Sequence, residues 1–303
     1  GVGATATVLA GQEFGIPVVG TMAHSWVMFY KDEEKAFRRY AEAYPDNCQF
    51  LIDTYDVLGQ GLPHAIKVAR EYLEPQGKRL KAVRIDSGDL AYLSKKIRAE
   101  LDEAGMQDCQ IIASNSLDEY TITSIHEQGG RFNAYGVGER LITARSEPVF
   151  GAVYKLVAVE EQGRFVPRIK ISEAPEKITN PGRKAVYRVF NREGHAIADL
   201  IAGYDENPDL SAPYRYIDPI KPWKNRRFED CTLRPLQQLV VKAGERVTAP
   251  APLKEIQAYV RRQLHDEIWE EEQRFENPHR HYVDMTPDYY AAKMDLLHER
   301  QDG

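Results

Sequence analysis

The chain has 303 residues, a formal net charge of −6 and a sequence pI of about 5.8. This acidic balance argues against nucleic acid as the main partner, because a phosphate backbone requires a basic face. No apolar run approaches the roughly 20 residues that cross a bilayer, so we expect no membrane partner. At 34.5 kDa the chain exceeds what one hydrophobic core usually organises, which predicts one large domain and a smaller one.

The cysteines and the start of the chain suggest a cellular setting. Cys48, Cys109 and Cys231 are widely separated and form no Cys-x-x-Cys or Cys/His cluster that binds zinc, so a reducing cytoplasm is the simplest interpretation. The chain starts at Gly1 without Met or a signal-like stretch and enters the small-residue segment GVGATATVLAG. We therefore expect further residues upstream.

In the first half, short apolar runs alternate with longer amphipathic ones at about 30 residues per repeat, the size of a β/α unit. The runs are nearly continuous in apolarity, as in parallel strands buried on both faces. Helix starts are expected at Asp32, at Asp89 and at a capping box of Ser116 with Glu119. This order favours an α/β barrel or a doubly wound sheet. The expected strands are Ile16–Gly20, Gln49–Asp53, Lys81–Asp86, Gln110–Ser114 and Phe132–Val137.

A period of two residues replaces this pattern after about Gly151, in GAVYKLVAVEE and then AVYRVFNREGHAIADLI. Asn191–Gly194 lies within the second segment like a hairpin turn. The change of period marks a different architecture. We predict an α/β barrel domain over residues 1–158 and a β-rich segment with C-terminal helices over residues 159–303.

The last hundred residues have a weaker pattern. Residues 207–252 are rich in proline, which predicts a loop with short strands. Two helices are expected to close the chain. One is densely charged and spans Leu253–Phe275, and the shorter one has Thr286 as its cap and Pro287 at its first position.

Polar residues and glycines recur where the expected strands of the first half end. In parallel α/β folds, ligands bind at this carboxyl edge, where loops and helix N-termini converge. The sequence therefore predicts a binding site there. The candidates are Thr21, His24, Asp53, Thr54, Asp56, Arg84, Asp86, Ser87, Gly88, Asp89, Ser114, Asn115, Gly136 and Gly138.

Each candidate side chain has a structural alternative. A lone histidine such as His24 is more often structural, although a neutral imidazole at a strand exit can accept a phosphoryl group. Asp53 and Asp86 would repel each other unless a cation such as Mg²⁺ lies between them, whereas Asp89 is better explained as a helix cap. Arg84 can stack on a heteroaromatic ring, clamp an anion or form a structural salt bridge.

The glycines suggest phosphate contacts. Backbone N–H groups can approach a phosphate closely at two places, Ser87 with Gly88 and Gly136 with Gly138. This is a weak signal, because the sequence contains neither a Walker A loop nor a GxGxxG fingerprint after a strand.

Read together and in order, several strings resemble the nicotinate phosphoribosyltransferase family. They are GIPVVGTMAHSWV, FLIDTYD, VRIDSGDL, IIASNSLDEY, YGVGERLITA, VYKLVAV and KISEAPEKITNPGRKAVYR, which span nearly the whole chain. The resemblance implies a TIM-like α/β barrel with a second, smaller domain, assembled as a homodimer. It also implies the reaction of nicotinate with phosphoribosyl pyrophosphate to give nicotinate mononucleotide and pyrophosphate, with Mg²⁺ as cofactor. The resemblance implies further that ATP hydrolysis is coupled to this reaction through a phosphohistidine.

The resemblance also implies residue roles. The phosphohistidine falls on His24, and the catalytic Asp53 and Asp86 match positions near the pyrophosphate, the ribose and Mg²⁺. Arg84 matches a position beside the pyridine ring. Glu139 departs from the small hydroxyl residue usual after GVG. The other predicted substrate-binding residues are Thr21, Ser87, Gly88, Ser114, Asn115, Gly136 and Gly138.

Two alternatives share these motifs. A nicotinamide phosphoribosyltransferase has the same fold and mechanism but must recognise a neutral amide. A non-catalytic relative that binds nucleotides as a sensor need not become phosphorylated. This second alternative is considered because the family's N-terminal segment is absent from the chain and Glu139 adds a negative charge, whereas the matched site residues favour the enzyme.

Overall fold

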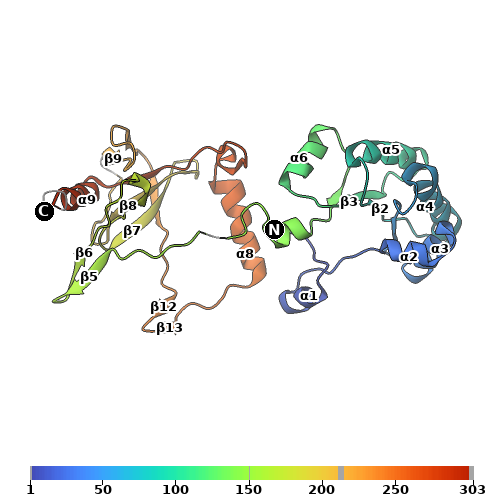
Figure 1. The fold of residues 1–303 in the computed structure, drawn as a ribbon, viewed down its shortest axis with the longest axis horizontal. Coiled ribbons are helices and arrows are strands. Elements are labelled where there is room, and N and C mark those ends of the chain that lie inside the picture. Colours follow the sequence, from blue (N-terminus) through green and yellow to red (C-terminus); the bar gives the residue numbers. More distant parts are fainter. Residues whose placement is uncertain (1, 150, 211–214, 300–303) are drawn as a thin grey trace. The chain divides into compact units, whose positions relative to one another are not determined.

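The computed structural model describes residues 2–149, 151–210 and 215–299. The chain forms two compact units, Val2–Gly151 and Ala152–Gly303, and each has its own sheet (Figure 1). The functional domain boundary placed after residue 158 stays a prediction. Within the described ranges, no helix combines the length and the apolarity needed to cross a membrane.

The N-terminal unit is an α/β structure around a parallel sheet with the strand order β1-β2-β3-β4. The strands are β1 (Gln49–Leu51), β2 (Ala82–Ile85), β3 (Gln110–Ala113) and β4 (Ala134–Tyr135). The helices are α1 (Val8–Phe14), α2 (His24–Phe29), α3 (Glu33–Ala43), α4 (Leu62–Val68), α5 (Leu90–Glu103), α6 (Glu119–Glu127) and α7 (Glu139–Ile142). Short π-helical turns over Val57–Gly61 and Ala69–Leu73 flank α4, and a 3-10 turn follows over Glu74–Gln76. The α/β prediction is confirmed, and the sheet is open over the residues described.

One face of the sheet is fully buried but the other is covered only in part, so the burial of both faces that the apolar runs predict is confirmed for one face only. Phe50, Val83 and Ile111 are fully buried in successive strands. Phe37 of α3 stacks on Phe50 with ring centroids 4.6 Å apart. At Gly61 the backbone comes so close to β1 that an added Cβ would lie 1.9 Å from the carbonyl oxygen of the residue after the strand. This packing holds the end of β1 firmly in place.

Two local predictions for this unit are wrong. Ile16–Gly20 is not a strand but makes a single parallel bridge between Val18 and Thr5, and Pro17 within the run has no N–H to donate. Helix α6 is capped by Asp118 rather than Ser116, since Asp118 Oδ1 accepts the N–H of Thr121 at 2.8 Å. The caps at Asp32 and Asp89 are confirmed because each carboxylate accepts a first-turn N–H at 3.0 Å.

The C-terminal unit is β-rich and centres on a six-stranded sheet with the order β10-β9-β14-β8-β7-β11. Strand β14 runs parallel to β8, and the other pairs are antiparallel. The sheet strands are β7 (Lys184–Phe190), β8 (Ala196–Gly203), β9 (Arg215–Ile217), β10 (Asn225–Arg227), β11 (Thr232–Pro235) and β14 (Val283–Met285). Two separate hairpins are β5 (Ala158–Glu161) with β6 (Arg164–Pro167), and β12 (Val241–Lys242) with β13 (Glu245–Arg246). The helical segments are α8 (Leu253–Arg262), α9 (Pro287–Glu299), a π-helical turn over Gln263–Glu267 and 3-10 turns over Pro175–Lys177 and Glu270–Gln273.

The predicted turn between β7 and β8 is confirmed. Asn191 Oδ1 accepts the N–H of His195 at 2.8 Å, and Gly194 has a φ of 87°. The start of α9 is confirmed too, because Thr286 Oγ1 accepts the N–H of Tyr289 at 3.3 Å. The turn chemistry readable from sequence therefore fixes both connections.

Two extents in this unit are wrong. The helix expected over Leu253–Phe275 ends at Glu267, where the chain becomes extended and Trp269 stacks on His195 at 4.4 Å between ring centroids. The strand pattern expected from Gly151 begins only at Ala158, since the preceding segment exposes its side chains and has no partner strand in the described part of the unit.

A half-buried ionic cluster joins β8 to the segment that leads into β14. His281 Nε2 lies 3.4 Å from Asp199 Oδ1, and His281 Nδ1 lies 3.0 Å from Glu272 Oε2. Arg188 of β7 pairs with the same aspartate at 2.9 Å. The contact with Asp199 raises the pKa of His281 above its ordinary value, so the protonated ring stabilises this region.

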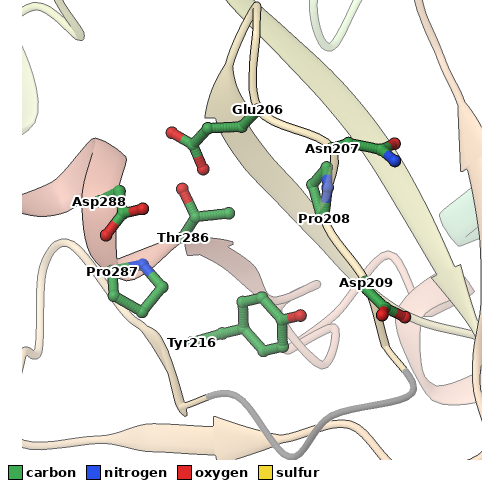
Figure 2. Close-up of a pocket in the computed structure, with 8 residues that line it drawn as sticks. All are labelled: Glu206, Asn207, Pro208, Asp209, Tyr216, Thr286, Pro287 and Asp288. Atoms are coloured by element: carbon green, nitrogen blue, oxygen red, sulfur yellow. The ribbon is translucent and has the colours of Figure 1, made fainter.

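A hollow of about 300 Å³ lies in the C-terminal unit, between the loop after β8 and the start of α9 (Figure 2). Figure 2 shows acidic side chains from both segments around it, together with Thr286. None of the site residues predicted from sequence lines it. Its lining residues are Glu206, Asn207, Pro208, Asp209, Tyr216, Thr286, Pro287 and Asp288.

Candidate active site

The strand exits of the N-terminal unit bring a histidine and two carboxylates together. His24 is the first residue of α2, and its Nε2 lies 3.8 Å from Asp53 Oδ1 and 3.8 Å from Asp86 Oδ2. Its other nitrogen, Nδ1, lies 3.2 Å from Thr54 Oγ1. The imidazole is 38% exposed, so one ring is held by side chains from two strand exits and still meets solvent.

Asp53 is the buried member of this cluster and holds two of its neighbours by hydrogen bonds. Its side chain has no exposed surface, and Oδ2 accepts both the N–H of Asp86 and the hydroxyl of Ser87 at 2.7 Å. These bonds tie the loop after β2 to the end of β1. Its Oδ1 is buried and has no hydrogen-bond partner among the residues that the structure describes. This second oxygen faces His24.

Each nitrogen of the Arg84 guanidinium contacts one neighbouring side chain. Its Nε donates to Ser114 Oγ at 2.8 Å and its Nη1 donates to Thr21 Oγ1 at 2.9 Å. Its Nη2 pairs with Asp86 Oδ2 at 3.4 Å. The salt bridge considered from sequence is therefore present. The side chain remains 26% exposed, which leaves part of the guanidinium open to a ligand.

The chain after β3 has unusual backbone geometry. Asn115 and Ser116 have φ values of 91° and 47°, in the left-handed region that non-glycine residues rarely adopt. Ser114, just before them, is buried and bonds to both Arg84 and the carbonyl of Ile85. Two successive strained residues at a strand exit are typical of a functional loop.

The predicted glycines differ in what they offer. Gly88 has a φ of 81°, and an added Cβ would lie 2.9 Å from a methyl group of Leu93, so only glycine fits without strain. The N–H of Gly136 donates to the carbonyl of Ala113 at 2.7 Å, which commits it to the sheet rather than to a phosphate. Gly138 precedes α7, and an added Cβ there would meet open space.

Some residues at this edge escaped sequence reasoning. The sequence places Thr54 at a strand exit but predicts no role for it, whereas in the structure its hydroxyl contacts His24. Asp118 pairs with Arg140 beside a hollow of about 230 Å³ that Arg145 also lines. Hydrogen bonds from Thr121 and the pairing with Arg140 lower the pKa of Asp118 to about 2. In the sequence, this hollow is indicated only by the two basic residues of GERLITAR, Arg140 and Arg145.

The fold and the site define a class of protein: an α/β protein with a histidine, two carboxylates and an arginine gathered at the carboxyl edge of a parallel sheet. The family model "Nicotinate phosphoribosyltransferase (NAPRTase) family" matches residues 2–193, and "Nicotinate phosphoribosyltransferase C-terminal domain" matches residues 183–293. The chain belongs to the nicotinate phosphoribosyltransferase family, as its motifs predict.

Individual relatives agree with this assignment. Nicotinate phosphoribosyltransferase of Bacillus subtilis is 45% identical over 302 residues, which cover 99% of this chain and 60% of the relative. The Caenorhabditis elegans protein of the same name is 32% identical, over 96% of this chain and 61% of its own length. The crystal structure of human nicotinic acid phosphoribosyltransferase superposes with a TM-score of 0.76 at 25% identity, over 98% of this chain and 65% of that one. The chain thus spans about 60% of the length of the curated relatives it matches.

Proposed function

We infer that the protein containing this chain is a nicotinate phosphoribosyltransferase in NAD biosynthesis. It condenses nicotinate with phosphoribosyl pyrophosphate to form nicotinate mononucleotide and pyrophosphate. The observation that carries this proposal is the meeting of His24 with Asp53 and Asp86 beside Arg84, at the edge where parallel α/β folds bind ligands. Family membership supports the same reaction.

The charges of the cluster suit this chemistry. Departure of pyrophosphate from C1 of the ribose leaves an oxocarbenium-like centre, which nearby carboxylates stabilise. Asp86 is 30% exposed and can face the ribose directly. Asp53 is buried and acts through the hydrogen bonds by which it positions Asp86 and Ser87. Arg84 keeps an exposed part for the nicotinate ring or an anionic group.

Mg²⁺ fits this edge as a partner of the pyrophosphate. Within the described ranges, no group of three or more acidic, histidine or cysteine side chains forms a complete metal cage. Mg²⁺ is commonly held by one or two carboxylates together with substrate phosphates. The unpartnered Oδ1 of Asp53 and the exposed carboxylate of Asp86 would hold the ion, which neutralises the leaving group when bound.

We assign His24 as the residue phosphorylated by ATP. Its ring is 38% exposed, so a γ-phosphate can approach it, and phosphorylation would place negative charge beside the pyrophosphate site. This charge would favour formation and release of product, which couples ATP hydrolysis to the reaction.

The proposal extends to the whole molecule. The open sheet β1–β4 is part of a closed TIM-like barrel that further chain completes, and the protein is a cytoplasmic homodimer. The parallel order of these strands, with helices between them, supports the barrel. The free thiols of Cys48, Cys109 and Cys231 fit a reducing compartment. Light scattering measures the dimer directly.

The test uses radiolabelled ATP with the wild-type protein and with His24→Ala. We expect acid-labile label on the wild type, none on the variant, and loss of ATP stimulation of nucleotide formation. A variant that keeps both the label and the stimulation refutes the assignment of His24. Parallel assays with nicotinate and with nicotinamide distinguish a nicotinate from a nicotinamide phosphoribosyltransferase. A wild-type protein that neither becomes labelled nor forms nucleotide would support the alternative of a non-catalytic nucleotide sensor.

A further inference from the structure

Two loops at the carboxyl edge of the sheet carry predicted substrate-binding residues, and one ion pair joins them. The loop after β3 spans residues 114–118, and the loop after β4 spans residues 136–138. Asp118 ends the first loop and pairs with Arg140 of α7, the helix that follows the second loop. The reaction as described above does not use this pair.

The two oxygens of Asp118 have separate partners. Oδ1 accepts the N–H of Thr121 at 2.8 Å and so caps α6, whereas Oδ2 accepts from Nη1 of Arg140. The carboxylate is 19% exposed and the guanidinium 27% exposed, so solvent screens this pair less than it screens a pair on the open surface. The carboxylate is therefore held by a helix on one side and reaches the second loop on the other.

A second contact joins the same two loops at their base. The N–H of Gly136 donates to the carbonyl of Ala113 at 2.7 Å, directly where β3 ends. The pair of Asp118 with Arg140 lies at the far end of both loops. Together the two contacts bracket the loops and fix the spacing of the residues between them.

The loop after β3 needs an anchor at its far end because its backbone is strained. Asn115 and Ser116 have φ values of 91° and 47°. Such left-handed conformations of non-glycine residues persist only where the surroundings hold them. Leu117, the next residue, is 1% exposed, and the paired Asp118 follows it. These two residues hold the strained segment on its C-terminal side.

We propose that the ion pair of Asp118 with Arg140 positions the two loops to bind phosphoribosyl pyrophosphate, without touching the substrate itself. The proposal rests on the function inferred above, from which it takes the substrate. Of the two substrates only this one carries phosphates, the groups that glycine-containing loops can approach closely. A substrate held by two loops binds tightly only if their spacing is preorganised, because ordering them on binding costs free energy.

The test separates the ion pair from the helix cap. Asp118→Asn keeps a capping oxygen, since Asn and Asp cap helices equally well, but it removes the charge that holds Arg140. Arg140→Gln removes the other partner, the double variant removes both, and Arg140→Lys keeps the positive charge. Asp108→Asn is the matched control because Asp108 pairs with Arg79 at 2.5 Å between the segments that enter β3 and β2, at the opposite edge of the sheet.

The readouts are steady-state kinetics of the full-length protein and amide hydrogen exchange of the two loops. We expect Asp118→Asn and Arg140→Gln each to raise KM for phosphoribosyl pyrophosphate on the order of 10-fold, with kcat and KM for nicotinate within about 2-fold of wild type. Exchange should become faster in both loops. The double variant should be no worse than either single variant, because both remove the same interaction. Arg140→Lys should keep KM near wild type, and Asp108→Asn should change none of these values.

A wild-type KM for phosphoribosyl pyrophosphate in Asp118→Asn overturns the proposal. A much larger effect of Arg140→Gln than of Asp118→Asn, with the effects multiplying in the double variant, also overturns it, because Arg140 would then bind the substrate directly. Asp118→Ser, which keeps a capping oxygen, replaces the asparagine variant if that variant does not fold. If the wild type forms no nucleotide, the proposed function fails, and unchanged exchange in both loops of Asp118→Asn would then still refute the positioning role of the pair.

Discussion

Asp53 offers a way to separate the architecture of the site from its chemistry. Its Oδ2 accepts two hydrogen bonds at 2.7 Å, and its Oδ1 faces His24. Asn is nearly the same size and can keep the acceptor while replacing the other oxygen by an NH₂ group. Ala removes both. The two variants should therefore behave very differently.

The expected magnitudes follow from these contacts. A hydrogen bond to a charged group contributes about 1.5–3 kcal/mol, and the exposed hydroxyl of Ser87 regains water when its bond is lost. We expect Asp53→Ala to lower the free energy of unfolding by about 2–4 kcal/mol, and Asp53→Asn by about 1 kcal/mol or less. The amide of Asn presents N–H groups to His24 Nε2, so nucleotide formation should fall on the order of 100-fold or more even though the fold is kept.

Urea denaturation followed by circular dichroism gives the free energies of unfolding, and a steady-state assay of nicotinate mononucleotide gives the activity. The reasoning fails if Asn destabilises the protein as much as Ala, because the acceptor role of Oδ2 would then be wrong. It fails equally if the Asn variant keeps wild-type activity, because the oxygen that faces His24 would then be dispensable.

Burial raises the pKa of the Cys48 and Cys109 thiols to about 12, so a thiol reagent at pH 8 should modify only Cys231 in the folded protein and all of the cysteines after denaturation. Rapid modification of more than one thiol under native conditions would contradict the buried placement. In the C-terminal unit, the raised pKa of His281 means that its stabilising contribution is complete below the unfolded-state pKa of about 6.5 and is lost as pH rises through the higher folded-state pKa. Thermal unfolding of His281→Gln against wild type should show a larger difference at pH 6 than at pH 9, and a difference independent of pH would remove the ionic role of the ring.

The sequence predicts the strands and strand ends that carry the candidate site residues. The runs ending at Asp53 and Asp86 supply fully buried side chains to one face of the sheet, so their apolarity locates the strands and their exits. The sequence does not predict strand β14, because it has only three residues and includes a buried acidic residue, Asp284. A segment this short gives no alternation to detect.

Side-chain contacts between residues that follow different strands could not be predicted from the sequence. Thr54 and His24 are 30 positions apart, and their contact depends on side-chain torsions that no pattern encodes. The apolar run at Ile16–Gly20 shows the opposite failure. It has strand-like composition, but Val18 and Val19 remain about half exposed because the described part of the unit offers no neighbouring strand beyond a single bridge.

The guanidinium of Arg84 links three separate stretches of chain, through Thr21 before α2, Asp86 after β2 and Ser114 after β3. A bound anion that takes over one of these donors must displace the side chain that now holds it. The longest contact, at 3.4 Å to Asp86, would break most readily, and the released carboxylate would then turn away from the anion that replaces it. Binding of the anion and movement of the Asp86 carboxylate would thus occur together. The measured affinity for the anion would therefore include the free energy of moving Asp86 as well as that of the contacts with Arg84.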